Sequence, residues 1–146
     1  MFTKKIIVIS AAVAVMAGGI YGYSEYNRKP ANLERVRPDV QVSAIELIKT
    51  FEDNEQDANA KFLDKVISVK GKIKSVEKND KGYYTVILGE KEIMSSVRCS
   101  MDSVHQQKAA GLTAGTEITM KGACTGYNAD ELLGSDVILN RCVVSK

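Results

Sequence analysis

The sequence has few of the residues from which common chemical sites are built. Its 146 residues include one histidine, three cysteines and no tryptophan, and no two cysteines form a CxxC pair. A disulfide-rich mini-protein or a zinc ribbon would need more cysteines at closer spacing. The cysteines fall on three different strand-like segments, and no spacing places His105 beside Cys99 as a base beside a nucleophile. We therefore expect no catalytic residue, metal site or cofactor, and no enzyme.

The sequence also has almost no excess of charge of one sign. Twenty lysines and arginines against 18 aspartates and glutamates leave a formal net charge of +2. Domains that bind nucleic acid are usually far more basic, so nucleic acid is disfavoured as a partner. The length favours a single domain with one small core.

A long uncharged run does occur, at the N-terminus. The segment from Ile6 to Ser24 has no charged residue, and about 20 apolar residues span a bilayer as a helix. Tyr21, Tyr23 and Tyr26 lie at its far end, where an interfacial aromatic belt would be expected. We predict a single transmembrane helix over residues 1–23, retained as a signal anchor. A cleaved signal peptide is the alternative, because small residues such as Ala12 and Ala14 could form a cleavage site.

The orientation follows from the charges that flank this run. Lys4 and Lys5 precede it, as a short basic tail precedes an export signal. Basic residues after the run argue the opposite way by simple counting. We prefer a cytoplasmic N-terminus and an extracytoplasmic domain. Residues 24–42 contain Pro30 and Pro38 and show no apolar period, and we interpret them as a stalk.

Residues 43–146 form the predicted globular domain. Ser43 and Glu46 match a capping box, and an apolar stripe then continues to about residue 63, which predicts one amphipathic helix. The stretch Lys65–Val76 alternates with the period of a strand. Its Val69 and Ile73 face the core and its lysines face water.

Four more strand-like segments follow, with a short helix between the third and fourth strands. We predict these elements over Tyr83–Leu88, Glu92–Met101 with Ile93 inward, the helix at residues 103–112, Thr116–Cys124 and Asp136–Val144. The order of one helix, three strands, a short helix and two strands is that of an OB-fold. The predicted fold class is therefore mainly β, a five-stranded OB-fold barrel with an N-terminal amphipathic helix and one transmembrane helix before it.

Four pieces of this domain resemble one bacterial family. They are FEDNEQDANAKFLDKVISVKGKI at Phe51–Ile73, VRC at Val97–Cys99, MKGACTG at Met120–Gly126 and VILNRC at Val137–Cys142. In order and spacing they resemble the tRNA_anti-like family of small OB-fold domains, many of them on exported proteins. The resemblance implies the shape of an anticodon-binding domain but not tRNA binding, and it supplies no catalytic residue. Relatives are often lipoproteins, whereas this chain has no cysteine directly after its apolar run.

A binding face can be predicted from lysines and tyrosines. OB-folds bind oligonucleotides on the face of their second and third strands, where basic residues track phosphates and aromatic residues stack on bases. The candidates here are Lys70, Lys72, Lys74, Tyr83, Tyr84 and Tyr127. The same tyrosines could stack on sugars or pack against a protein, and the lysines could be a solvated strand face.

Cys124 and Cys142 lie near the ends of the fourth and fifth strands, which are neighbours in an OB-fold. Outside the cytoplasm they could form a disulfide. Two alternatives remain open, which are a Cys99–Cys142 bridge and three buried thiols that pack as small apolar groups.

The sequence thus predicts a single-pass bacterial membrane protein with an extracytoplasmic OB-fold that acts as a binding or interaction module. The protein or small-molecule partner is not determined. One alternative is an OB domain that binds single-stranded nucleic acid or tRNA. The other is a ligand-free structural subunit of an envelope complex.

Overall fold

The structure is a computed structural model that describes residues 2–28 and 31–145. The chain divides into two compact units between Ala31 and Asn32. Each unit is described by itself.

The first unit contains the helix α1 (Phe2–Tyr26). Its apolar stretch Lys4–Tyr26 has 23 residues and makes no buried contact. At 1.5 Å per residue this stretch is about 35 Å long, enough to cross the roughly 30 Å hydrocarbon core of a bilayer. The helix is therefore a candidate membrane span, as predicted. A cleaved signal sequence has a similar composition, so retention of the helix stays a prediction.

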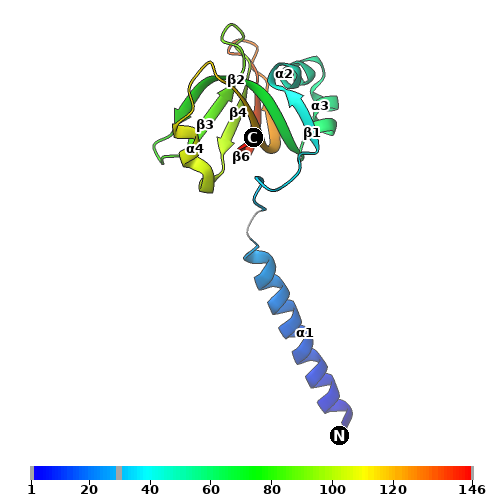
Figure 1. Ribbon diagram of the computed structural model, residues 1–146. Helices are drawn as coiled ribbons and strands as arrows, with labels where there is room; N and C mark the ends of the chain where they lie inside the picture. Colours follow the sequence, from blue (N-terminus) through cyan, green and yellow to red (C-terminus); the bar gives the residue numbers. More distant parts are fainter. Residues whose placement is uncertain (1, 29–30, 146) are drawn as a thin grey trace. The chain divides into compact units, whose positions relative to one another are not determined.

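The second unit is a closed five-stranded barrel (Figure 1). Its strands are β2 (Val66–Lys78), β3 (Tyr84–Leu88), β4 (Ser96–Met101), β5 (Glu117–Asn128) and β6 (Asp136–Ser145). They pair in the order β2, β3, β4, β6, β5, and β5 pairs again with β2. Only the β4–β6 pair in this ring is parallel among the described strands. This is the strand order of an OB-fold, and the predicted fold class is confirmed.

Strand β2 closes the barrel because it pairs twice. Its first half, Val66–Lys72, pairs with β5, and its second half, Ile73–Lys78, pairs with β3, with an irregularity between Ile73 and Ser75. Ile73 is buried and Lys72 is exposed, which confirms the predicted register. A short strand, β1 (Val40–Ser43), adds parallel to the outer side of the first half.

Two helices cover the core where one was predicted. They are α2 (Ala44–Asp53) and α3 (Glu55–Phe62), and they bury Leu47, Phe51 and Phe62. Ser43 Oγ accepts a hydrogen bond from the amide of Glu46 at 3.2 Å, so the predicted cap exists.

The prediction of one continuous helix was wrong because Asn54 starts a second one. Its Oδ1 accepts from the amide of Asp57 at 3.2 Å, and its Nδ2 donates to Asp57 Oδ2 at 2.9 Å. Asparagine is among the best N-cap residues, and its side chain competes with the helical backbone for hydrogen bonds.

Two strand boundaries also differ from the prediction. The third barrel strand begins at Ser96 instead of Glu92, and Ile93 is exposed rather than inward. Lys74 Nζ donates to the carbonyls of Ile93 and Met94, which directs this backbone away from the sheet. Strand β5 continues to Asn128 because its pairing with β6 extends that far. The predicted short helix is present as η1 (Ser103–His105) and α4 (Gln106–Ala110).

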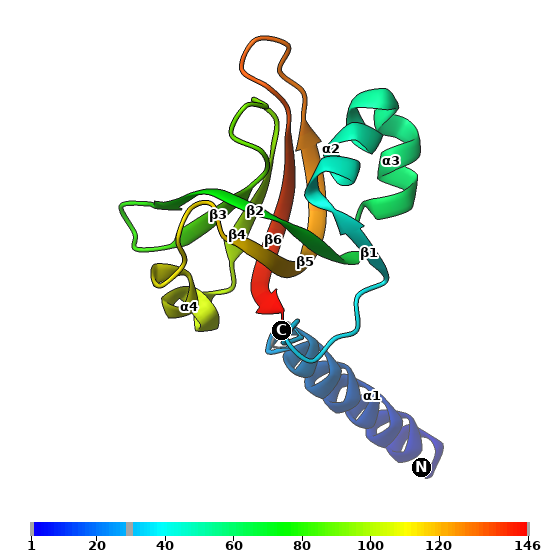
Figure 2. The same ribbon diagram turned by 45° about the horizontal axis from the view of Figure 1, so that its top comes forward.

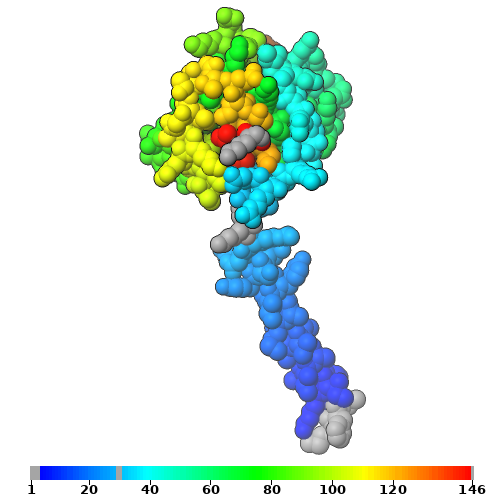
Figure 3. Space-filling view, in the orientation of Figure 1, coloured from blue at the N-terminus to red at the C-terminus, as the bar shows by residue number. Residues whose placement is uncertain are grey.

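Residues 32–42, interpreted from sequence as part of a stalk, pack on the barrel. Leu33 is only 2% exposed. Lys121 Nζ on β5 donates to the carbonyls of Glu34 at 3.0 Å and Val36 at 2.7 Å. Figure 3 shows the cyan atoms of this region beside the red atoms of β6 and the yellow atoms of α4. We call residues 32–39 the docked segment. The burial of Leu33 could not be predicted from a sequence with no apolar period.

Candidate binding surfaces

The outer face of β3 and β4 is where OB-folds commonly bind ligands. On β4, Arg98 and Ser100 alternate with core residues and so face outward. Arg98 lies opposite Ile87 on β3 and Ile138 on β6. Its guanidinium pairs with Glu77 at 2.8 Å. Arg98 is thus the basic side chain at the centre of this outward row, and a carboxylate already neutralises it.

Each of the three lysines predicted to bind a ligand already contacts another group of the protein. Lys70 pairs with Glu117 at 2.8 Å and Lys72 with Glu90 at 3.4 Å. The hydrogen bond and charge of Lys70 lower the pKa of Glu117, and Glu117 raises the pKa of Lys70. These exposed pairs are screened by solvent and contribute little to stability. Lys74 is half-buried and holds the loop after β3.

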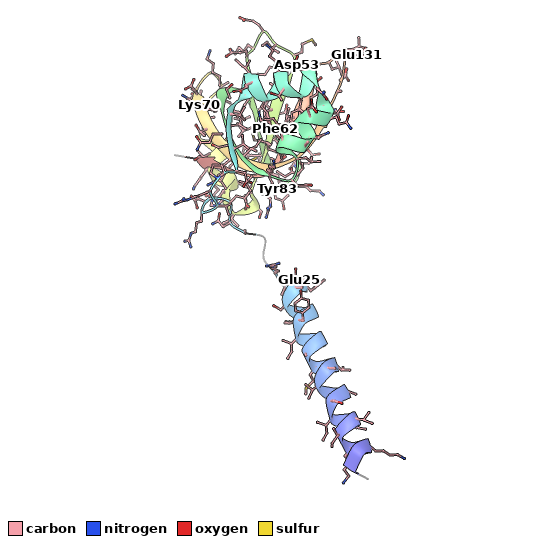
Figure 4. All side chains as sticks on the ribbon, turned by 90° about the vertical axis from the view of Figure 1, so that its right-hand side faces the viewer. Glu25, Asp53, Phe62, Lys70, Tyr83 and Glu131 are labelled. Carbon is pink, nitrogen blue, oxygen red and sulfur yellow. The ribbon has the colours of Figure 1, made fainter. Side chains whose placement is uncertain are left out.

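The three predicted tyrosines do not form one aromatic surface. Tyr83 is exposed at the start of β3. Tyr84 packs against the core, and Tyr127 stacks on Phe51 with ring centroids 4.9 Å apart. Figure 4 shows Lys70 and Tyr83 on separate parts of the barrel. The six residues are therefore dispersed, and a role for them in binding stays a prediction.

All three cysteines are buried free thiols. The thiol of Cys142 on β6 lies beside Cys99 on the neighbouring strand β4. Burial raises the pKa of Cys142 well above its usual range, and burial raises the pKa of Cys124 to about 11. Because the thiolate is the reactive form, the thiols of Cys124 and Cys142 are poor nucleophiles in the folded protein. Cys124 and Cys142, the predicted disulfide pair, are not bonded to each other.

A further surface, which the sequence analysis missed, lies where α2 meets the loops after β3 and β5. A groove of about 350 Å³ runs between α2 and the loop at residues 89–95. It is lined by Ile45, Ile48, Lys49, Glu52, Asp53, Glu90, Ile93 and Ser95. We call α2 and α3 up to Asp57, with the loops at 89–95 and 129–135, the loop end of the barrel (Figure 2). The adjacent Leu132 and Leu133, between the predicted strands Thr116–Cys124 and Asp136–Val144, were the available signal.

Hydrogen bonds hold the parts of the loop end together. Ser95 Oγ donates to Glu52 Oε1 at 2.6 Å and accepts from the amide of Ser135 at 3.1 Å. Gly134 has φ +86°, and a Cβ there would lie 2.5 Å from the carbonyl carbon of Met94. Only glycine fits this close approach. The two loops and α2 therefore form one preorganised surface.

The comparisons with known proteins agree with this architecture. A closed barrel with this strand order defines an OB-fold protein, here with an apolar N-terminal helix before it. The chain belongs to the tRNA_anti-like family, whose sequence profile matches residues 1–143. The match begins at the first residue, so it includes the apolar helix as well as the barrel.

One solved structure resembles the fold at low sequence identity. It is the crystal structure of a candidate nucleic acid-binding lipoprotein from Klebsiella pneumoniae. The two chains are 18% identical, the TM-score is 0.56, and the match covers 73% of this chain and 92% of the other. At this identity the likeness shows the fold alone. No curated protein matches the sequence.

Proposed function

We propose that this protein is a membrane-tethered, extracytoplasmic OB-fold module that binds a partner and carries out no catalysis. The observation that carries the proposal is the position of the apolar helix α1 directly before the barrel unit. A basic tail with Lys4 and Lys5 before the apolar stretch is typical of an export signal. The lipoprotein among the structural neighbours supports a place in the cell envelope for proteins of this fold.

The charge on the barrel supports a partner other than nucleic acid. Affinity for nucleic acid comes largely from basic side chains that neutralise phosphates. The central Arg98 of the outward β3–β4 row is paired with Glu77, and Lys70 and Lys72 are paired with carboxylates. A nucleic-acid strand that bound to any of these three basic side chains would have to displace its carboxylate partner.

Single-stranded nucleic acid or tRNA is the second candidate ligand. The neighbour's description as a candidate nucleic acid-binding lipoprotein favours it, as does the OB-fold itself. A structural role without a ligand is the third candidate, and co-purification of a stable envelope complex would support it.

Reporter fusions to the C-terminus would test the placement. We expect alkaline phosphatase, which folds only in an oxidising compartment, to be active there and a green fluorescent reporter to stay dark. The reverse pattern would place the barrel in the cytoplasm. The intact mass of the membrane-extracted protein would also show whether α1 is retained.

Titration of fluorescent oligonucleotides and tRNA against the full chain in nanodiscs would test the ligand. We expect no saturable binding at low or at physiological salt. Binding that falls steeply with salt, and falls further in Arg98→Ala, would favour the second candidate instead.

A further inference from the structure

Exposed apolar side chains are concentrated at the loop end. Among the described residues of the barrel unit, seven large apolar side chains are exposed, and five of them lie on α2 or on the two adjoining loops. These five are Ile45, Ile93, Met94, Leu132 and Leu133. The most exposed are Leu132 at 83% and Leu133 at 74%. Exposed apolar patches with a polar rim mark sites of interaction.

The rim of this patch is strongly acidic. Residues 49–57, 89–95 and 129–135 contain eight carboxylates and two lysines. Lys72 and Lys74 of β2 also contact the loop at residues 89–95, so the net charge of this region is −4 in a chain whose total is +2. Figure 4 shows Asp53 and Glu131 at the same end of the barrel. Among the described residues, no ion pair involves Asp53 or Glu131. The field around the groove therefore attracts positive charge.

Hydrogen bonds fix the backbone of the two exposed leucines, Leu132 and Leu133. Asp130 Oδ1 accepts hydrogen bonds from the amides of both Leu132 and Leu133 at 2.8 Å. Gly134 then brings this turn against Met94, and Ser95 ties both loops to α2. A surface ordered before binding loses less conformational entropy when a partner docks. The loop end thus has the features of a preformed docking site.

We propose that the loop end binds a positively charged amphipathic segment of a partner protein, with its apolar side chains on the groove and the leucine turn. Its lysines or arginines contact Asp53, Glu131 and the other carboxylates of the rim. This inference rests on the proposed function as a binding module and names the class of partner.

Two other occupants fit the charge less well. Two copies joined by this surface in a twofold dimer would bring the same acidic rim against itself, and like charges oppose that contact. An anionic bilayer surface would repel it for the same reason. In both ribbon views the loop end lies away from the docked segment, through which the chain enters the barrel (Figures 1 and 2).

The test uses the full chain in zwitterionic nanodiscs and a synthetic helical peptide with leucines on one face and lysines on the other. Empty nanodiscs give the background. We expect saturable binding that weakens with added salt, and no binding of a matched peptide with glutamates in place of the lysines. Equal binding of both peptides would overturn the proposal.

Variants locate the site. Leu132→Ser with Leu133→Ser should weaken binding at least about tenfold, which corresponds to 1.4 kcal/mol. Asp53→Asn with Glu131→Gln should weaken it several-fold and reduce the salt dependence. The matched control is Val104→Ser, because Val104 is 82% exposed but lies on η1, outside the loop end. Unchanged binding in both double variants would overturn the proposal.

Two further measurements complete the test. Sedimentation should show the same oligomeric state for the wild type and the double leucine variant, and anionic vesicles should not compete with the peptide. A dimer that the leucine variant disperses, or competition by vesicles, would assign the surface to a second copy or to the membrane. Failure of the peptide would leave the reporter-fusion result intact, so the two proposals can fail separately.

Discussion

The two ends of the barrel differ in the exposure of their leucines. At one end the docked segment buries Leu33, and Lys121 donates to two of its carbonyls. At the loop end, Leu132 and Leu133 remain in solvent. The backbone makes hydrogen bonds to side chains at both ends, so the difference in leucine exposure does not come from a disordered backbone at one end. A chain segment covers the first end, and none covers the second among the described residues.

The largest expected effect contrasts a leucine from each end. Leu33→Ala removes a buried side chain, and burial losses of this kind cost about 2 to 5 kcal/mol. Leu132→Ala removes an exposed one and should stay within about 0.5 kcal/mol. Chemical denaturation of both variants would measure the difference in the free energy of unfolding. Equal small effects would mean that the docked segment adds nothing to the stability of the barrel.

The next effect concerns the lysine that binds the docked segment. Lys121 is 7% exposed and donates to the carbonyls of Glu34 and Val36. Lys121→Ala leaves these acceptors without their partner, which should cost about 1 to 3 kcal/mol. Lys91→Ala, in the exposed loop after β3, is the control and should be neutral. Hydrogen exchange should show faster opening of residues 32–39 in Lys121→Ala alone.

A smaller effect is expected at the start of α2, the helix that lines the groove. Ser43 Oγ accepts from the amide of Glu46, and Ser43→Ala should cost about 1 kcal/mol. Thermal unfolding would measure this loss, with the conservative Ser43→Thr as the control that keeps the cap. An unchanged midpoint in Ser43→Ala would show that the cap does not hold α2 on the barrel.

The smallest effect should come from the exposed ion pair of the docked segment. Lys108 pairs with Glu34 at 2.9 Å, and its hydrogen bond and charge lower the pKa of Glu34. A carboxyl whose pKa is lower in the folded state stabilises the fold above its unfolded pKa, about 4.3. That contribution disappears as the pH falls through the lower folded value.

Comparing Glu34→Gln with the wild type would isolate this contribution. We expect the variant to have a slightly lower thermal midpoint at pH 7 and low salt. The difference should shrink as the pH falls through the lowered pKa of Glu34, and also at high salt, because the pair is exposed to screening. A difference that changes with neither pH nor salt would assign the effect to packing rather than to charge.

Some features of the fold follow from neighbouring residues alone and were predictable. The alternation of Val69 and Ile73 with lysines predicted β2, because side-chain direction along a strand has a period of two. Ser43 and Glu46 predicted the start of α2, because a cap needs only residues three positions apart. The family resemblance agreed with these patterns and with the order of the five strands.

The sequence by itself determined the apolar N-terminal helix, the barrel strands and the family, because these depend on local pattern and composition. Only the tertiary structure decided that Leu33 is buried, that Cys142 lies beside Cys99 rather than being bonded to Cys124, and that Tyr127 packs on Phe51. The groove at the loop end was also decided only by the tertiary structure, because Glu52, Ser95 and Ser135, which hold it together, are far apart in the chain. Such contacts arise only where closure of the barrel brings distant segments together, and no local period encodes which segments will meet.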